Sequence, residues 1–322
     1  MKPLVIVTRK LPASVELRMK ELFNVRLNGD DKVFTKEDLI AAVKEAHVLV
    51  TTVTDEISGG VLSKAAPDLK MIANYGVGVD HIDLMSARDK RIIITNTPGV
   101  LTEDTADMAM LLILGITRRM SEGEKMLRAG KWKIWSPIGM LGMRLRDKNL
   151  GIIGMGRIGQ ALALRAKTFG LNIHYYNRQQ INEDLEKSLC ATYWASLDQM
   201  ITQMNIISLN CSSTPDTHHI MSRRRIGLMQ KNAYLINTTR GDVVDEDALI
   251  EALEEKTIAG AGLDVYKNEP NINHRLLNLD IVLLTPHMGS ATDEARIAMG
   301  EKVIINVKTF LDGHSPGDRV LA

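Results

Sequence analysis

The stretch NLGIIGMGRIGQALA at residues 149–163 is the most informative about the fold, because it places a glycine-rich turn between a strand and a helix. Its apolar start is typical of a buried strand, and an amphipathic pattern follows from Arg157. Gly154, Gly156 and Gly159 form the pattern G-x-G-x-x-G in this strand–turn–helix context. We predict a dinucleotide-binding turn, in which the first glycine permits the turn, the second admits a pyrophosphate and the third lets helix and strand pack. The alternative is a glycine-rich turn that binds no nucleotide.

Strands and helices alternate from this turn towards the C-terminus. Six strands that begin at a glycine-rich turn match a complete dinucleotide-binding domain. The expected strands are Asn149–Ile153, Ile173–Tyr176, Ile206–Leu209, Ala233–Asn237, Ala259–Leu263 and Ile281–Leu284, with helices at Arg157–Phe169, Leu197–Gln203, Arg223–Met229 and Asp245–Glu255.

The first third of the chain shows the same alternation, which predicts a second parallel sheet. Its expected strands are Leu4–Thr8, Val48–Thr52, Met71–Ala73 and Ile92–Thr95, with helices at Ser14–Leu22, Lys36–Ala46 and Asp83–Ala87. After a break at 96–100, one long helix is expected, with Thr102 as its N-cap and its end near Arg128. The last expected helix is Ala291–Leu311.

Length and composition restrict the class of protein. A chain of 322 residues predicts about two domains. Lys and Arg total 40 and Asp and Glu total 39, so the net charge of +1 argues against binding to nucleic acid or to an anionic membrane. The longest apolar run, Met108 to Ile116, is far short of the roughly 20 residues of a membrane-spanning helix. Cys190 and Cys211 form no CxxC pair, which favours a reducing, cytoplasmic location and no cysteine-rich metal site. We expect no metal.

The strand after the glycine-rich turn ends in HYYNRQQ at 174–180. An NAD site normally has an acidic residue here, about 20 residues past the turn, to bind the ribose 2′-hydroxyl. This chain has Asn177 followed by Arg178, and a guanidinium suits the 2′-phosphate of NADP. We therefore expect NADP(H) to be preferred, with NAD(H) possible. The alternative is that Arg178 is a solvated surface arginine.

Three polar residues follow three late strands: Arg240, Glu269 and His287. Ligands of open α/β sheets bind outside the carboxyl ends of the strands, where these side chains and a bound nicotinamide would meet. Reduction of a carbonyl needs a proton donor at the oxygen, and histidine suits this role. A neighbouring carboxylate fixes its tautomer, while an arginine binds a substrate carboxylate or polarises the carbonyl. Each residue alone is more often structural, so the hypothesis depends on the three together with the turn.

Six sequence blocks are characteristic in combination. They are NYGVGVDHID at 74–83, NTPGVLTEDTAD at 96–107, GIIGMGRIGQ at 151–160, INTTRGDVVDEDAL at 236–249, AGLDVYKNEP at 261–270 and TPHMGSAT at 285–292. On these blocks the chain resembles the D-isomer-specific 2-hydroxyacid dehydrogenases over nearly its full length. The segments KWKIWSP, YYNRQ and HMGSAT look most like the glyoxylate/hydroxypyruvate reductase branch of that family.

The resemblance implies an α/β fold of two doubly wound parallel-sheet domains. Residues 1–99 would form a smaller, flavodoxin-like substrate domain that is completed by a C-terminal helix at 290–322. Residues 100–289 would form the Rossmann cofactor domain. Within it, a helix and loop at 102–147 would join two subunits in a homodimer.

The resemblance also assigns catalytic and substrate-binding roles. Arg240 would bind the carboxylate and carbonyl of a 2-oxo acid. His287 would be the acid/base and Glu269 its partner. The backbone amides of Val77 and Gly78 would bind the substrate carboxylate.

Further residues are implied at the pocket and at the cofactor. In the reductase branch an aromatic residue of the 131–137 loop reaches the partner subunit's active site, and Trp135 would narrow the pocket in this way. The alternative is a tryptophan packed within the dimer interface. Asp264 would meet the nicotinamide carboxamide. The full cofactor-binding set implied is Thr105, Gly154, Gly156, Arg157, Ile158, Gly159, Asn177, Arg178, Gln179, Ser212, Thr238, Asp264 and Gly289.

The activity implied is the NADPH-dependent reduction of glyoxylate or hydroxypyruvate to the 2-hydroxy acid. Two alternatives stay open at this point. The first is reduction of another 2-oxo acid, such as a phenylpyruvate or 2-ketogluconate. The second is a dinucleotide-sensing, co-repressor-like protein, because such relatives can keep the Arg, Glu and His.

Overall fold

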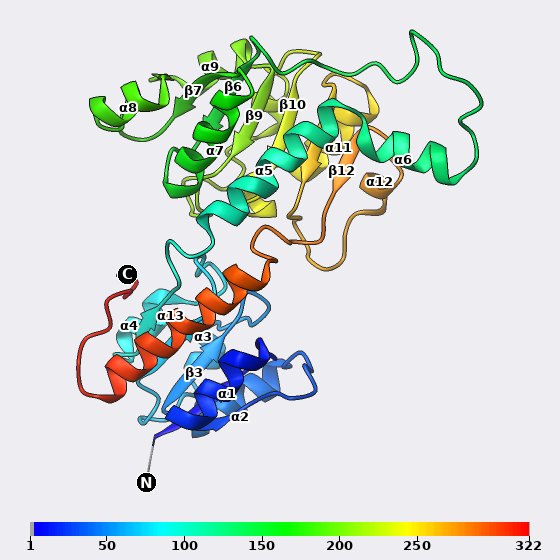
Figure 1. The fold of residues 1–322 in the computed structure, drawn as a ribbon. Coiled ribbons are helices and arrows are strands. Elements are labelled where there is room, and N and C mark those ends of the chain that lie inside the picture. The colour runs from blue at the N-terminus through cyan, green and yellow to red at the C-terminus, as the bar shows by residue number, and fades with distance from the viewer. Residues whose placement is uncertain (1–2, 322) are drawn as a thin grey trace. The chain divides into compact units, whose positions relative to one another are not determined.

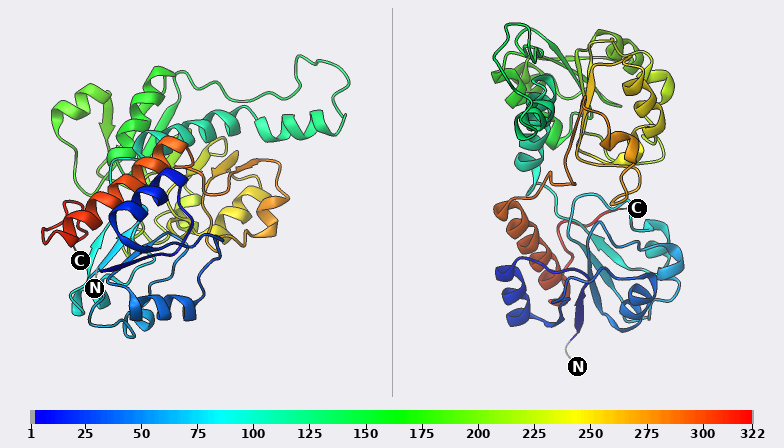
Figure 2. Two further views of the ribbon diagram at one scale, coloured as in Figure 1. Left: turned by 60° about the horizontal axis from the view of Figure 1, so that its bottom comes forward. Right: turned by 90° about the vertical axis from the view of Figure 1, so that its right-hand side faces the viewer.

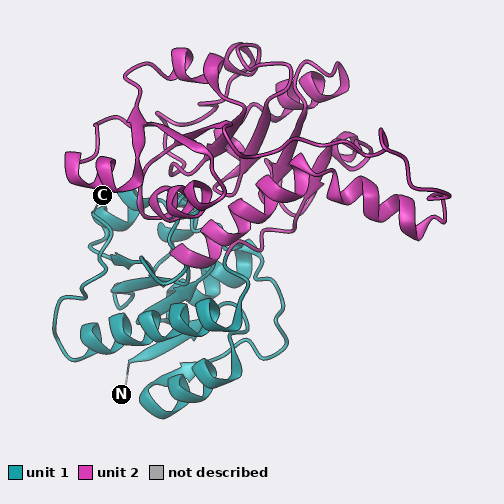
Figure 3. Cartoon of the chain, turned by 45° about the horizontal axis from the view of Figure 1, so that its top comes forward, with its two compact units in different colours: residues 1–101, 290–322 teal, residues 102–289 magenta. Residues whose placement is uncertain are grey.

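The computed structural model describes residues 3–321, which form two compact units, each with its own sheet and core (Figures 1 and 3). Unit 1 comprises the described residues up to Leu101 together with those from Ser290 onward. Unit 2 comprises Thr102–Gly289. The chain leaves unit 1 once and returns to it once, so unit 1 is built from both ends of the sequence.

Unit 1 contains a five-stranded, all-parallel sheet in the order β2-β1-β3-β4-β5. This is the flavodoxin-like strand order. Its strands are β1 (Leu4–Val7), β2 (Asn24–Arg26), β3 (Val48–Thr51), β4 (Met71–Asn74) and β5 (Ile93–Thr95). Helices cover both faces of the sheet, which is why the central strands read as continuous apolar runs.

The helices of unit 1 are α1 (Ala13–Leu22), α2 (Lys36–Glu45), α3 (Gly59–Leu62), α4 (Leu84–Asp89) and α13 (Asp293–Leu311). Helix α13 packs beside α1 on one face, and α2, α3 and α4 cover the other (Figure 2). The expected helix at Ala291–Leu311 is confirmed, whereas a helix over the whole of 290–322 is wrong in extent. Helix α13 ends at Leu311, and the chain then returns to the sheet, where Val320 N donates to Ile94 O at 2.9 Å.

Unit 2 contains a seven-stranded, all-parallel sheet in the order β12-β11-β10-β9-β6-β7-β8. Its strands are β6 (Asn149–Ile153), β7 (Asn172–Tyr176), β8 (Ala191–Tyr193), β9 (Ile206–Leu209), β10 (Tyr234–Asn237), β11 (Gly260–Leu263) and β12 (Val282–Leu284). The order is that of a Rossmann fold, with reversal at β6. The expected count of six strands is one short, because β8 is a three-residue edge strand without an apolar run.

Helices cover both faces of this sheet as well. They are α5 (Thr102–Thr117), α6 (Met120–Arg128), α7 (Arg157–Thr168), α8 (Glu183–Leu189), α9 (Leu197–Gln203), α10 (Arg223–Ile226), α11 (Glu246–Glu254), α12 (His274–Leu277) and the 3-10 turn η1 (Gly241–Val243). One core lies under α5, α7 and α8, and the other under α9, α10 and α11.

The single long helix expected from Thr102 to Arg128 is wrong, because the chain breaks between α5 and α6. Arg119 adopts a left-handed conformation with φ of 54°. The carbonyl of Thr117 accepts a hydrogen bond from Met143 N at 2.8 Å and so leaves the helical ladder. Thr102 is the first helical residue and not the cap before it.

Helix α6 and the irregular segment after it extend away from the rest of unit 2 (Figures 1 and 2). No helix within residues 3–321 is long and apolar enough to cross a membrane. The expected cytoplasmic location is not tested by this observation and stays a prediction.

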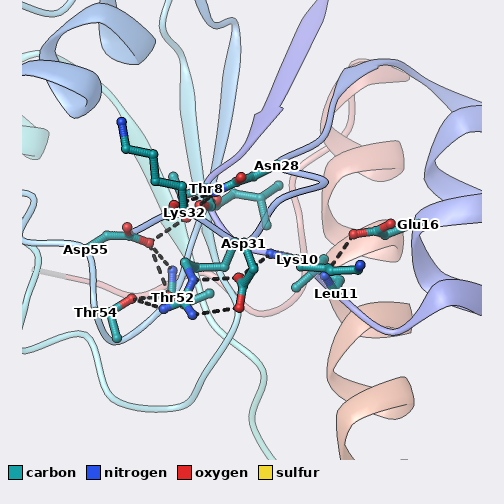
Figure 4. A network of polar contacts seen from close by, with 12 residues as sticks. Thr8, Lys10, Leu11, Glu16, Asn28, Asp31, Lys32, Thr52, Thr54 and Asp55 are labelled. Carbon is teal, nitrogen blue, oxygen red and sulfur yellow. Dashed lines mark hydrogen bonds and ion pairs between the residues drawn. The ribbon is translucent and has the colours of Figure 1, made fainter. Parts of the chain in front are cut away.

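A polar network closes the carboxyl ends of β1, β2 and β3 in unit 1 (Figure 4). Arg9 forms a two-point ion pair with Asp31 at 2.8 and 3.0 Å and donates to Thr54 at 3.0 Å. Asp55 is fully buried and accepts from Thr8 Oγ1 at 2.5 Å. In doubly wound folds this switch between β1 and β3 is a common ligand site. Here the side chains of Thr8 and Asp55, which follow β1 and β3, hydrogen-bond to each other.

Candidate active site

The glycine-rich turn of unit 2 is held by contacts that leave no room for a side chain at two of its glycines. Gly154 has φ of +99°, and a Cβ there would lie 2.6 Å from the backbone nitrogen of Cys211. A Cβ at Gly159 would lie 2.3 Å from the carbonyl oxygen of Gly154. These two positions therefore need glycine for the turn and for helix–strand packing, as the motif predicts.

Gly156 differs from them, because a Cβ at this position would meet nothing within 4 Å. Gly156 is the N-cap of α7, whose first residues are Arg157 and Ile158. Open space in front of a helix N-terminus is what a pyrophosphate requires. Arg157 is exposed and Ile158 is half-buried at this opening.

The end of β7 holds the turn from the side. Tyr176 O accepts from Gly154 N at 3.0 Å, and Asn177 Oδ1 accepts from Met155 N at 2.9 Å. Because its oxygen is used in this way, Asn177 has its amide N–H groups left to donate. Arg178 is exposed, and its guanidinium makes no hydrogen bond or ion pair with the described residues. Gln179 is exposed beside it.

Two polar atoms at the neighbouring strand ends lie buried without a partner in the described part of the chain. They are Oδ1 of Asn210, after β9, and Oγ1 of Thr238, after β10. Ser212 is exposed on the same loop as Asn210. Buried polar groups are almost always hydrogen-bonded, so these atoms indicate a polar ligand at this edge of the sheet. Together with the open cradle at Gly156, they fit a nicotinamide dinucleotide.

The predicted proton-transfer pair is in contact. His287 Nδ1 lies 2.6 Å from Glu269 Oε2, and the other carboxylate oxygen accepts from Tyr266 N at 2.9 Å. Burial alone would raise the pKa of Glu269. The hydrogen bond and charge of His287, the Tyr266 N–H and the charge of Arg240 together hold that pKa below its usual value. Glu269 is therefore ionised at neutral pH. It accepts a hydrogen bond from Nδ1–H of His287, which leaves Nε2 of the imidazole for a ligand.

Arg240 lies in a loop whose backbone packs directly against the loop that carries Glu269. Asn237, the last residue of β10, donates from Nδ2 to the Arg240 carbonyl at 2.8 Å. A Cβ at Gly241 would lie 2.0 Å from the carbonyl carbon of Tyr266, so the two loops touch through backbone alone. Asn237 was not predicted as a site residue, and its only signal is a polar residue at the end of an apolar strand.

Asp264 organises the backbone around His287. Its buried carboxylate accepts from Thr285 Oγ1 at 2.6 Å, Met288 N at 2.9 Å and Gly289 N at 2.8 Å. Its own carbonyl accepts from His287 N at 2.9 Å. Burial raises the pKa of Asp264, and these hydrogen bonds oppose the rise. The role implied for Asp264 at the nicotinamide carboxamide stays a prediction.

The remaining predicted residues lie in three places. Thr105 of α5 is buried and close to Gly289. A Cβ added at Gly289 would lie 3.5 Å from the methyl group of Thr105. Val77 and Gly78 lie in unit 1, in the loop after β4. Trp135 lies in the segment after α6 and is 73% exposed.

Comparison with known proteins decides the family. The sequence profile of the D-isomer specific 2-hydroxyacid dehydrogenase NAD binding domain matches residues 110–289. A glyoxylate reductase from Thermococcus litoralis is 44% identical over 324 residues, which cover 99% of this chain and 97% of that protein. The chain belongs to the D-isomer-specific 2-hydroxyacid dehydrogenases.

Solved structures agree with this assignment of the dehydrogenase. A D-isomer specific 2-hydroxyacid dehydrogenase from a Polaromonas strain is 39% identical, with a TM-score of 0.92 and full coverage of both chains. An NADPH-dependent glyoxylate/hydroxypyruvate reductase from Sinorhizobium meliloti, solved with NADP and malonate, is 32% identical with a TM-score of 0.87, covering 99% of this chain and 97% of that one.

The resemblance and the fold class expected from the sequence are thereby confirmed. The protein is an NAD(P)-dependent 2-hydroxyacid dehydrogenase of the glyoxylate reductase branch, and it acts on a 2-oxo acid.

Proposed function

We propose that this dehydrogenase reduces glyoxylate or hydroxypyruvate with NADPH and uses His287 as the acid. The single observation that carries the proposal is the 2.6 Å contact between His287 and the ionised Glu269. It supports a histidine whose tautomer and orientation are set for proton transfer. The glyoxylate reductases among its relatives support the choice of substrate.

Each of the site residues has its own role in this reaction. Glu269 accepts a hydrogen bond from Nδ1–H of His287. The second proton of the imidazolium form is then on Nε2, from which it passes to the carbonyl oxygen of the substrate. Arg240 binds the carboxylate and polarises the carbonyl, and Val77 and Gly78 donate backbone N–H groups to the carboxylate. The reduced nicotinamide supplies the hydride for the carbonyl carbon when it is bound.

NADPH is the preferred cofactor in this proposal. The guanidinium of Arg178 and the amide N–H groups of Asn177 donate to no acceptor within residues 3–321, which supports binding of a 2′-phosphate. Charge-assisted bonds to such a group contribute roughly 1.5–3 kcal/mol, which is about one to two decades in affinity. We expect kcat/KM to be at least tenfold higher with NADPH than with NADH.

The test of cofactor choice uses a pair of charge-neutralising variants. Arg178→Ala should remove most of the preference by weakening NADPH, with little change for NADH. Lys231→Ala removes an equally exposed positive charge at the amino ends of the strands, and it should leave the preference unchanged. Equal use of both cofactors by the wild type would mean that Arg178 is a solvated surface residue.

We also propose a homodimer formed through α5, α6 and the segment 131–147. Its support is an exposed apolar surface that comprises Leu111, Met120, Leu127, Trp132, Ile134, Trp135, Ile138 and Leu141. Patches of this kind on a water-soluble surface mark protein–protein contacts. Light scattering of the purified protein measures the oligomeric state, and a monomer at micromolar concentration would contradict the proposal.

The decisive experiment for the function is a panel of 2-oxo acids assayed with NADPH and with NADH. Loss of NADPH absorbance should be fastest with glyoxylate or hydroxypyruvate. Faster turnover of a phenylpyruvate or of 2-ketogluconate would reassign the substrate within the family. No turnover with any 2-oxo acid, despite NADPH binding, would favour a dinucleotide-sensing binding protein.

A further inference from the structure

We propose that Asn74 is a positioning residue that, together with Asn96, sets the backbone N–H groups of Val77 and Gly78 for the substrate carboxylate. The proposal rests on the proposed function, which assigns those N–H groups to the substrate. Asn74 itself touches no substrate. It acts by holding the loop that follows β4.

The side-chain amide of Asn74 binds this loop at two points. Asn74 is the last residue of β4 and is 1% exposed. Its Nδ2 donates to the carbonyl oxygens of Gly76 at 3.0 Å and Gly78 at 2.8 Å. Both amide hydrogens are therefore used. A Cβ at Gly76 would lie 3.3 Å from Nδ2, so the loop passes close over the amide.

The orientation of this amide is determined from its other side. Its Oδ1 lies 3.1 Å from Nε2 of His81 and accepts a longer bond from Thr51 Oγ1 at 3.5 Å. A flipped amide would place its oxygen against the two carbonyl oxygens of Gly76 and Gly78, where no donor is available. The side chain is thus satisfied in one orientation only.

A second asparagine completes the arrangement. Asn96, which directly follows β5, donates from Nδ2 to the carbonyl of Val77 at 2.8 Å. The carbonyl of Gly76 also accepts from Thr97 N at 3.0 Å. All three consecutive carbonyls, at Gly76, Val77 and Gly78, therefore point to protein donors.

Holding these carbonyls determines where the N–H groups point. A trans peptide is planar, so the N–H of each residue lies opposite the carbonyl of the residue before it. Asn74 thereby directs the N–H of Val77 through the Gly76 carbonyl, and Asn96 directs the N–H of Gly78 through the Val77 carbonyl. Neither N–H donates to any acceptor among residues 3–321, which leaves both for a carboxylate.

A similar hydrogen bond from a strand-end asparagine to a loop carbonyl occurs at the end of β10 in unit 2. There the buried Asn237 closes the run YLIN, as Asn74 closes MIAN, and its amide donates to the carbonyl of Arg240. In both units a buried asparagine at a strand end shapes the loop that follows it.

The expected kinetic signature follows from the kind of bond involved. Hydrogen bonds to the substrate carboxylate are made equally in the ground state and the transition state, so their loss raises KM more than it lowers kcat. In Asn74→Leu, which has similar volume and no charge, we expect KM for glyoxylate to rise by about tenfold, the effect of weakening one charge-assisted bond. We expect kcat to change by less than about threefold.

The matched control is Asn28→Leu. Asn28 lies in the same unit, and its Nδ2 also donates to two loop carbonyls, those of Thr8 and Lys32, both at 2.7 Å. The same chemical change away from the loop at 76–78 should leave KM unchanged. Asn96→Leu, which loses the single bond to Val77, should raise KM in the same direction by a smaller factor and serves if Asn74→Leu fails to fold.

Binding of oxalate to the NADPH-bound protein gives a readout besides turnover. Its dissociation constant should rise in parallel with KM in Asn74→Leu, while NADPH binding and the pH profile of kcat stay as in the wild type. An unchanged KM in both Asn74→Leu and Asn96→Leu, or an equal rise in Asn28→Leu, would overturn the inference.

The two proposals fail in distinguishable ways. If the wild type reduces no 2-oxo acid, the proposed function fails. The inference about Asn74 then still stands or falls on oxalate binding, and it is overturned if oxalate binds wild type and Asn74→Leu equally or binds neither. If the wild type is active and only the Asn74 effect is missing, the proposed function survives alone.

Discussion

His287 Nδ1 lies 2.6 Å from Glu269 Oε2. The two residues follow β12 and β11, which are neighbouring parallel strands of unit 2. Tyr266 N donates to the second carboxylate oxygen of Glu269 and so holds that side of the contact. Asp264 holds the other side, because it accepts hydrogen bonds from the backbone N–H groups of His287 and Met288. The pair is thus held by backbone groups and is ready before substrate binds.

The first prediction tests whether this pair acts as a unit. His287→Ala should lower kcat by the ~10²–10⁴ typical of general acid catalysis, with NADPH binding nearly unchanged. Glu269→Gln should also lower kcat, because it removes the charge that orients the ring. The double variant should be little slower than His287→Ala alone, since groups that act together are not additive. Near-normal turnover in His287→Ala would remove His287 from the mechanism.

The second prediction concerns Arg240. A guanidinium can bind the carboxylate and the carbonyl of a 2-oxo acid at two points, whereas an ammonium cannot. Arg240→Lys should therefore cause a large fall in kcat/KM, of the order of 10²-fold or more for two weakened charge-assisted bonds. Arg225→Lys, at a surface ion pair with Asp198, is the control and should be kinetically silent. Equal activity in Arg240→Lys would show that charge alone suffices.

The third prediction separates two glycines of the same turn. The methyl group added in Gly156→Ala would meet no protein atom within 4 Å, so thermal stability should be nearly unchanged. NADPH binding should weaken, because this methyl group takes the space of the pyrophosphate. Gly159→Ala should lower Tm, because its methyl would lie 2.3 Å from the Gly154 carbonyl, an overpacking that costs ~1–3 kcal/mol. Calorimetry and NADPH titration measure the two effects. Equal losses of stability in both variants would contradict the assignment.

The fourth prediction concerns Trp135, which is 73% exposed in the described chain. If its indole narrows the pocket of the partner subunit, Trp135→Ala should shift kcat/KM towards larger 2-oxo acids without dissociating the dimer. The measurements are a substrate panel and light scattering. Dissociation with unchanged selectivity would show instead that the tryptophan packs within the interface.

The fifth prediction is a pH dependence of stability that arises from Asp55. Burial raises the pKa of this carboxyl above its ordinary value, against the opposing hydrogen bonds from Thr8 and Thr52. The folded state therefore holds this proton more tightly than the unfolded state does. Its stabilising effect is present below the unfolded pKa, near pH 4, and is lost as pH rises through the folded pKa.

Asp55→Asn removes this titration. The Tm of Asp55→Asn should therefore rise relative to the Tm of the wild type as pH rises through that window. Thermal unfolding of both proteins from about pH 4 to neutrality measures the difference. A difference that stays constant with pH would mean that Asp55 has the same pKa in both states. Asp38→Asn, at the exposed N-terminus of α2, is the control, since the pKa of Asp38 is lowered and its effect has the opposite sign.

Much of the secondary structure follows from local sequence, because it depends on the backbone conformation of consecutive residues. The strand, turn and helix around Gly154 depend on residues that are neighbours in the chain, and so do the buried strands at 48–51 and 206–209. The break between α5 and α6 does not, because it depends on Met143 N reaching back to the carbonyl of Thr117. Strand β8 likewise exists only through pairing with β7.

The candidate site divides in the same way. The sequence by itself identified Arg240, Glu269 and His287 as polar residues after late strands, and the glycines of the turn, because residue type and position after a strand carry that information. Tertiary structure alone decided that His287 meets Glu269 through Nδ1, and that Asn74 binds the carbonyls of its own loop. Hydrogen bonds between separate loops depend on distances of a few tenths of an ångström, which only the packed backbone determines.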